Sequence, residues 1–234
     1  LIEACEFKWE AISPAIFGAL FQSVMNKKER RALGAHYTTE KNILKLIQPL
    51  FLDGLHAEFE HAKALKRGRR QALACGCGNF LVIAYRELRQ LEIDILRELY
   101  SSDEQRVLDV ATLSKINVDQ FYGIEIGEFP ARIAEVAMWM MDHIMNNRLG
   151  LSFGHNYARI PLKASPHILP ADALKADWAV LLPPEKCSYV FGNPPFIGSK
   201  YQTVEQRSQV REIAKLGGSG GTLDYVTAWF LKAG

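Results

Sequence analysis

The tetrapeptide Asn193-Pro194-Pro195-Phe196 is the group of residues in this sequence that says most about chemistry. The two prolines restrict the backbone and leave the Pro194 carbonyl without a competing local donor, while the Asn193 side chain offers a second carbonyl oxygen. Phe196 adds a flat apolar face beside these two acceptors. Two acceptors beside a ring are suited to hold a planar NH₂ group in the pyramidal geometry in which its lone pair can attack. A proline-stiffened surface turn is the alternative interpretation.

A glycine-containing turn lies earlier in the chain, in Ala74-Cys75-Gly76-Cys77-Gly78-Asn79-Phe80. Gly76 and Gly78 allow the backbone to turn sharply and to approach a ligand closely, and a helix beginning here presents unpaired N–H groups. A tight strand-to-helix turn without a ligand would have the same pattern.

Two acids follow other candidate strands, Glu125 in Gly123-Ile124-Glu125-Ile126 and Asp172 in Ala171-Asp172-Ala173-Leu174. A carboxylate at the end of the second strand of a nucleotide-binding sheet can accept hydrogen bonds from both hydroxyls of a ribose. A solvated charge at the sheet edge is the alternative for Glu125. Its distance from the glycine turn predicts an extra helical piece around residues 103 to 114.

The elements that must position these residues alternate between strands and helices. Short apolar or β-branched runs predict strands at 70–75, 120–126, 167–169 and 188–191. Helical spacing of apolar residues predicts helices after Thr38-Thr39-Glu40, after the glycine turn and over 130–146. This alternation predicts an α/β fold, an open and mostly parallel sheet wrapped on both sides, with ligands bound beyond the carboxyl ends of the strands. We expect a helical leader at 1–70 and an α/β core at 71–234.

Composition narrows the class of protein. The 234 residues are 48% hydrophobic and 23% charged with a net charge of +2, which excludes disordered and fibrous classes and a polybasic coat protein. No apolar run of membrane-spanning length and no signal peptide is present, so we expect a cytoplasmic protein without a membrane partner. The four cysteines and six histidines show no metal spacing, which predicts reduced thiols and no metal. The chain begins at Leu1 and stops after an apolar run, and we expect a fragment of a longer polypeptide.

The order of glycine turn, acid, second acid and Asn-Pro-Pro-Phe resembles that of the S-adenosylmethionine-dependent DNA adenine-N6 methyltransferases. The MmeI-like branch is the most similar, in which methyltransferase and restriction or related defence functions share a long polypeptide. The resemblance runs from about Gly34 to Phe230 and implies a doubly wound Rossmann-like sheet. It also implies that the piece ends before a target-recognition domain.

The resemblance assigns a role to each of these groups. The segment Gly34 to Thr39 corresponds to the motif that closes over the methionine part of the cofactor, Glu125 to the ribose ligand and Asp172 to the residue that meets the cofactor's adenine amine. The residues implied in cofactor binding are Tyr37, Thr38, Thr39, Ala74, Cys75, Gly76, Gly78, Asn79, Phe80, Glu125 and Asp172. The catalytic motif is Asn193, Pro194, Pro195 and Phe196, with the Phe196 ring stacking on the target base. Ile197 to Lys200 continues the motif, and the segment from Asp224 to Phe230 resembles the helical motif that follows it.

The binding loop departs from the family pattern Asp-Pro-Ala-Cys-Gly-Ser-Gly. Ala72-Leu73 replaces Asp-Pro, and Cys77 replaces Ser. A hydrogen bond from the cofactor's ammonium to the missing Asp is worth about 1.5 to 3 kcal/mol, so cofactor affinity is expected to fall by roughly tenfold to a hundredfold.

The sequence therefore predicts a site-specific methyltransferase that moves the methyl group of S-adenosylmethionine to N6 of an adenine flipped out of double-stranded DNA. Its further partners would be the other domains of the parent polypeptide. A protein-glutamine or RNA amino-methyltransferase is an alternative, because the same two acceptors suit any planar NH₂. A non-catalytic scaffold domain is a second alternative. A nicotinamide-dependent dehydrogenase is a weaker third, since it leaves Asn-Pro-Pro-Phe without a role.

Overall fold

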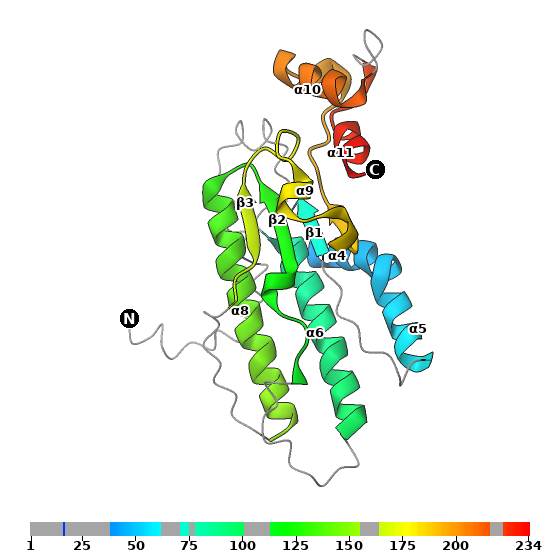
Figure 1. Ribbon diagram of the computed structural model, residues 1–234, viewed down its shortest axis with the longest axis vertical. Helices are drawn as coiled ribbons and strands as arrows, with labels where there is room; N and C mark the ends of the chain where they lie inside the picture. The colour runs from blue at the N-terminus through cyan, green and yellow to red at the C-terminus, as the bar shows by residue number, and fades with distance from the viewer. Residues whose placement is uncertain are drawn as a thin grey trace.

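The computed structural model describes residues 16, 38–61, 71–74, 78–100, 113–154, 164–215 and 222–234 (Figure 1). The longer helices are α4 (Glu40–Ile47), α5 (Asp53–His61), α6 (Asn79–Tyr100), α8 (Glu128–Ser152), α10 (Val204–Ala214) and α11 (Thr227–Ala233). Short helical turns are η2 (Gln48–Leu52), η3 (Val118–Gln120), α9 (Trp178–Leu181), η5 (Pro184–Lys186) and η6 (Ser199–Tyr201). The strands are β1 (Gln71–Ala74), β2 (Phe121–Glu125), β3 (His167–Pro170) and β4 (Tyr189–Gly192).

These four strands form one parallel sheet in the order β3-β2-β1-β4. Each lies within a residue or two of the run predicted from the sequence, including the 167–169 run, whose sequence signal is the weakest. The parallel sheet with intervening helices confirms a mixed α/β fold. The helical piece expected at 103–114 falls almost wholly outside the described residues.

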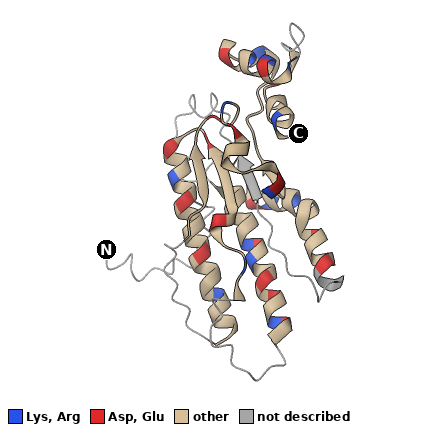
Figure 2. Ribbon diagram, viewed as in Figure 1, with Lys and Arg blue, Asp and Glu red and all other residues tan. Residues whose placement is uncertain are grey.

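Helices α6 and α8 pack side by side along the sheet (Figure 1). The spacing of apolar residues on α6 predicts a buried face. Leu81, Ala84, Leu88 and Leu91 of that face are buried, and Ile95 is half-buried. The methionines of α8 are predicted to pack in the core; Met138, Met141 and Met145 are buried there, and Met140 is half-buried. Acidic and basic residues are interspersed along these two helices (Figure 2), as the small net charge leads one to expect.

The first helical region differs from its prediction at one point. The spacing of apolar residues places Leu50 on the buried face of a continuous helix, but Leu50 is 43% exposed. Residues 48–52 form a π-helical turn that contains Pro49. Proline has no N–H to continue the α-helical ladder, so the register shifts. Phe51 is buried as its helical spacing predicts, and Leu52 enters the core in place of Leu50.

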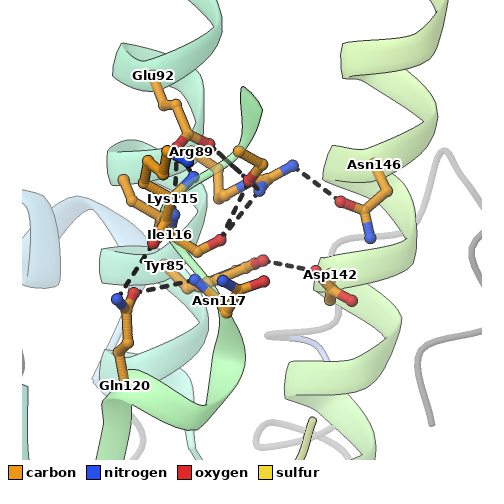
Figure 3. Close-up of polar contacts among 10 residues, drawn as sticks. Tyr85, Arg89, Glu92, Lys115, Ile116, Asn117, Gln120, Asp142 and Asn146 are labelled. Carbon is orange, nitrogen blue, oxygen red and sulfur yellow. Dashed lines mark hydrogen bonds and ion pairs between the residues drawn. The ribbon is translucent and has the colours of Figure 1, made fainter. Parts of the chain in front are cut away.

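A buried polar network joins α6 to α8 and to the segment before β2 (Figure 3). Arg89, 1% exposed, donates to Ser114, to the Ile116 carbonyl at 3.0 Å and to Asn146 Oδ1 at 2.8 Å. The Glu92 carboxylate lies 3.2 Å from the guanidinium and accepts from the Ile116 amide at 3.1 Å. The network therefore fixes where the chain enters β2.

A second contact between the same helices is Tyr85 Oη, which donates to Asp142 Oδ1 at 2.6 Å (Figure 3). Burial of the phenol, with the nearby Asp142 charge, raises the pKa of Tyr85 well above its usual value. The hydroxyl therefore stays protonated and serves as a donor.

Helices α10 and α11 lie beyond one end of the sheet, away from the long helices α6 and α8 (Figure 1). They share a small core of their own, made of Leu174, Val210, Tyr225 and Ala228, with Ile197 packed against it. Leu174 follows β3 and Ile197 follows β4, so this small core joins the ends of two strands. Within the described ranges, no helix is both long and apolar enough to cross a membrane.

Candidate active site

The register of the sheet brings the predicted site segments to one edge. Ala74, the last residue of β1, pairs with Ile124 of β2 on one side and Gly192 of β4 on the other. Glu125 pairs with Pro170, two residues before Asp172. Neighbouring parallel strands lie about 4.8 Å apart, so the last residue of β1 lies between Glu125 and the residue before the Asn193 loop.

Three aromatic contacts hold β4, the strand that precedes Asn193, in position in the sheet. The Phe51 ring of η2 lies 5.1 Å from Tyr189 and 5.9 Å from Phe191, between ring centroids. Phe80, in the first turn of α6, lies 6.3 Å from Phe191. Phe80 thus acts in packing between the glycine turn and β4, which is a structural task beside the binding role that the sequence predicts.

Asn193 is joined to a residue far away in the sequence. Its Nδ2 donates to Thr38 Oγ1 at 3.0 Å. Thr38 lies just before α4, and its neighbour Thr39 supplies the carbonyl that accepts from the Asn42 and Ile43 amides at the start of that helix. The expected cofactor-closing motif and the expected catalytic motif therefore touch.

The bond to Thr38 also determines which atom of the Asn193 amide is available to a ligand. With Nδ2 engaged by Thr38, the Oδ1 atom is left to accept from a ligand. Asn193 is exposed, Pro194 and Pro195 are half-buried, and the Phe196 ring is 77% exposed. An aromatic ring this open beside an amide acceptor is available for stacking on a flat partner.

Gly78 is required to be glycine for two separate reasons. Its φ of +81° lies in the left-handed region, and a Cβ at this position would lie 2.8 Å from the Ala134 Cβ of α8. Gly78 O also accepts from the Val82 amide at 2.9 Å, which starts α6. The turn therefore packs directly against α8, and this contact accounts for Gly78 without a ligand.

Asn79 is the buried residue at this turn whose side chain is not satisfied. It is 8% exposed, and its Oδ1 has no hydrogen-bond partner. A buried acceptor without a donor costs free energy unless a bound group supplies one. The other predicted members of this loop, Cys75 and Gly76, lie outside the described residues, as does Tyr37.

Glu125 is half-buried at the end of β2. The amide of Gly127 donates to its Oε1 at 3.4 Å, and its backbone carbonyl accepts from Ala171 at 2.8 Å. The second contact joins the end of β2 to the start of the segment that carries Asp172. Both carboxylates therefore lie along the same edge.

Asp172 is held by two protein donors. Its Oδ1 accepts from the Leu174 amide at 2.9 Å and its Oδ2 from Gln209 Nε2 at 2.7 Å. Each carboxylate oxygen has two lone pairs, so capacity for a further donor remains. The sequence analysis did not identify Gln209, because α10 carries no motif and a single glutamine on a helix gives no signal.

The chain is similar to known DNA methyltransferases. Residues 59–234 match the family model of the MmeI DNA-methyltransferase domain. The chain belongs to this family. A solved structure of the Type IIL restriction-modification enzyme MmeI in complex with DNA is 53% identical with a TM-score of 0.91, over 99% of this chain and 32% of that one. DNA methyltransferase A of Bacillus subtilis (strain 168) is 38% identical over 98% of this chain and 27% of its own length.

This MmeI-type methyltransferase domain thus spans about a third or less of the relatives that it matches. The family recognised from the sequence motifs is confirmed. Among the described residues of the domain, no three His, Cys, Asp or Glu side chains gather as ligands for a metal ion.

Proposed function

We propose that this domain transfers the methyl group of S-adenosylmethionine to N6 of an adenine flipped out of double-stranded DNA. In this proposal the parallel sheet is the first part of a doubly wound, Rossmann-like methyltransferase sheet. The observation that carries the proposal is the pairing of Ala74 with Gly192, the last residues of the two strands that precede the glycine turn and the Asn193 loop in the sequence. Methyl transfer requires donor and acceptor within one cavity, and neighbouring strand ends supply that.

The polar groups at the edge fit the proposed cofactor. Glu125 suits the two ribose hydroxyls and Asp172 the adenine amine, because both groups donate and carboxylates accept. Asn79 Oδ1 is a buried acceptor that still lacks a donor. Thr38 and Thr39 would lie at the methionine end of the cofactor with Tyr37. The loop that binds the cofactor would consist of Ala74, Cys75, Gly76, Gly78 and Phe80. The cofactor, when bound, supplies an activated methyl group on a sulfonium centre.

The chain's own residues would prepare the amine. Flipping an adenine out of the duplex costs a few kcal/mol of free energy. Stacking of the base on Phe196 would offset about 1 to 3 kcal/mol of this cost. Asn193 Oδ1 and the Pro194 carbonyl would accept hydrogen bonds from the two N–H groups of the amine. These bonds would direct the amine's lone pair toward the methyl group. Pro195 keeps the loop rigid. Most of the acceleration would come from alignment and fixed dipoles.

The proposal is tested by methyl transfer in the full polypeptide that the gene encodes. Tritium-labelled S-adenosylmethionine is incubated with DNA, RNA and protein, and the DNA product is digested to identify N6-methyladenine. We expect label in DNA only. Label in RNA or in glutamine side chains of protein would instead identify the alternative substrates that the same two acceptors suit.

Substitution of Asn193 tests the mechanism. Asn193→Ala should lower turnover by about two orders of magnitude or more, because one preorganised polar group is removed. Its dissociation constant for S-adenosylhomocysteine should stay within about twofold of the unmodified protein, since the cofactor meets other residues. Retained turnover in this variant would refute the role given to Asn193.

A second candidate function is a non-catalytic scaffold, which the Ala72-Leu73 departure favours. The missing Asp removes one hydrogen bond to the charged ammonium of the cofactor. Calorimetry separates the two candidates. Saturable heat on titration with S-adenosylmethionine supports the enzyme, and no binding at millimolar cofactor supports the scaffold.

A further inference from the structure

One glutamine of α10 connects the end of β3 with α11. Gln209 Nε2 donates to Asp172 Oδ2 at 2.7 Å, and Gln209 Oε1 accepts from Tyr225 Oη at 2.6 Å. An ionised carboxylate can only accept, so the amide nitrogen must face Asp172. The amide oxygen then faces Tyr225, whose hydroxyl must donate. The direction of both bonds is thus dictated by the chemistry of the three groups.

Tyr225 also reaches the loop of Asn193 to Phe196. Its backbone amide donates to the Ile197 carbonyl at 2.9 Å, directly after Phe196. The buried Gln202 donates to the same carbonyl at 3.3 Å and to the Leu223 carbonyl at 2.8 Å. A continuous path of hydrogen bonds therefore runs from Asp172, through Gln209 and Tyr225, to the residue after Phe196.

The surroundings of this path strengthen it. Tyr225 is 7% exposed in the small core of α10 and α11, whereas Gln209 and Asp172 are half-buried. Burial, with the charges of Asp172 and Glu205, raises the pKa of Tyr225 to about 12, so its hydroxyl carries its proton at neutral pH. Hydrogen bonds with little competing water are worth more than exposed ones.

We propose that Gln209 is a positioning residue, which holds the Asp172 carboxylate and the Asn193–Phe196 loop in one fixed relation. This inference rests on the proposed function, in which Asp172 meets the cofactor's adenine amine and Phe196 the target base. Gln209 occupies one lone pair of Oδ2, and the second lone pair of that oxygen would accept from the amine. The two purines, one from the cofactor and one from DNA, would then be aligned by a residue that touches neither.

The test measures how well the chain distinguishes a cofactor with the amine from one without it. Calorimetry gives dissociation constants for S-adenosylhomocysteine and for its 6-deamino analogue, in which purine replaces adenine. We expect the unmodified chain to prefer the amine by about tenfold, because a hydrogen bond to a charged acceptor is gained. In Gln209→Leu the preference should fall to about twofold, since Asp172 Oδ2 loses its protein donor and only Oδ1 is still held, by the Leu174 amide. Ser208→Ala, an exposed change on the same helix, is the matched control and should keep the tenfold preference.

A double variant tests whether the path acts as a unit. Tyr225→Phe should weaken binding of S-adenosylhomocysteine, as Gln209→Leu does. The double variant Gln209→Leu with Tyr225→Phe should bind no more than about twofold more weakly than Gln209→Leu alone, because both changes interrupt the same path. A preference that stays at tenfold in Gln209→Leu, or losses that multiply in the double variant, would overturn the inference. So would an unmodified chain that binds both compounds equally. Absence of any binding by the unmodified chain removes the proposed function itself, and this inference with it.

Discussion

Polar side chains serve opposite purposes between α6 and α8 and along the carboxyl edge of the sheet. Between the helices, Arg89 is 1% exposed and its two terminal nitrogens bond to several protein groups, while its Nε atom and Asn146 Nδ2 lack a partner among the described residues. Along the edge, Asn193 is exposed and bonded to the protein through its nitrogen only, and Asn79 keeps a buried acceptor without a donor. The first region should therefore govern stability, and the second should govern binding and turnover.

The largest effect on stability is expected at Arg89. Arg89→Met removes the guanidinium but keeps most of the side-chain length, so the Glu92 carboxylate and the Asn146 amide lose their charged partner. Removing one member of a buried ion pair costs about 3 to 5 kcal/mol. The free energy of unfolding, measured by urea denaturation of the chain, should fall by about this amount.

Arg97 on the same helix supplies the control for that variant. It is exposed, and Arg97→Met should change the free energy of unfolding by less than about 0.5 kcal/mol. A loss below about 1 kcal/mol in Arg89→Met would show that the buried network is not a main source of stability. The proposal that the region between α6 and α8 governs stability would then be wrong.

A gain in binding is expected at the edge from restoring the family residue. Ala72→Asp returns the acceptor that the resemblance places near the cofactor's ammonium, worth about 1.5 to 3 kcal/mol. The dissociation constant for S-adenosylmethionine should therefore fall by roughly tenfold to a hundredfold. Calorimetry checks this, with S-adenosylhomocysteine, which keeps the ammonium, as a second ligand. Equal affinity before and after the change would mean that residue 72 does not reach the cofactor.

The contrast between the two regions also explains what the sequence could predict. Strand ends, the glycine turn and the Asn193 loop are local patterns, and the sheet brought them to one edge as parallel topology requires. The Arg89 network was not foreseen, because Ser114 and Asn146 come from distant segments and show no periodic signal. The bond from Asn193 to Thr38 likewise joins residues 155 positions apart, although each had been singled out separately. Pro49 is visible in the sequence, but the spacing of apolar residues does not show that it shifts the helix register.

A smaller loss of turnover is expected at Thr38. Thr38→Val keeps the shape of the side chain but removes the acceptor for Asn193 Nδ2, so the amide is free to rotate. Because Asn193 is exposed and water can replace the bond, turnover should fall by about tenfold, less than in Asn193→Ala. Thr38→Ser keeps the hydroxyl and should restore most of the activity. A Thr38→Val enzyme with normal turnover would show that the hydroxyl does not orient Asn193.

The smallest effect is expected at the exposed start of α10, the helix that contributes Val210 to the small core. Thr203 and Gln206 form a capping box, in which Thr203 Oγ1 accepts from the Gln206 amide at 3.2 Å and the Thr203 amide donates to Gln206 Oε1 at 2.9 Å. Loss of such a cap costs about 1 kcal/mol, so Thr203→Ala should speed amide hydrogen exchange in α10 by about fivefold, and Thr203→Ser should not. Exchange in α6 and α8 should stay unchanged, because the small core buries only Leu174, Val210, Tyr225 and Ala228 and can open without the main one. Faster exchange in all three helices would mean instead that α10 unfolds only with the rest of the domain, and that the edge and the body share one cooperative unit.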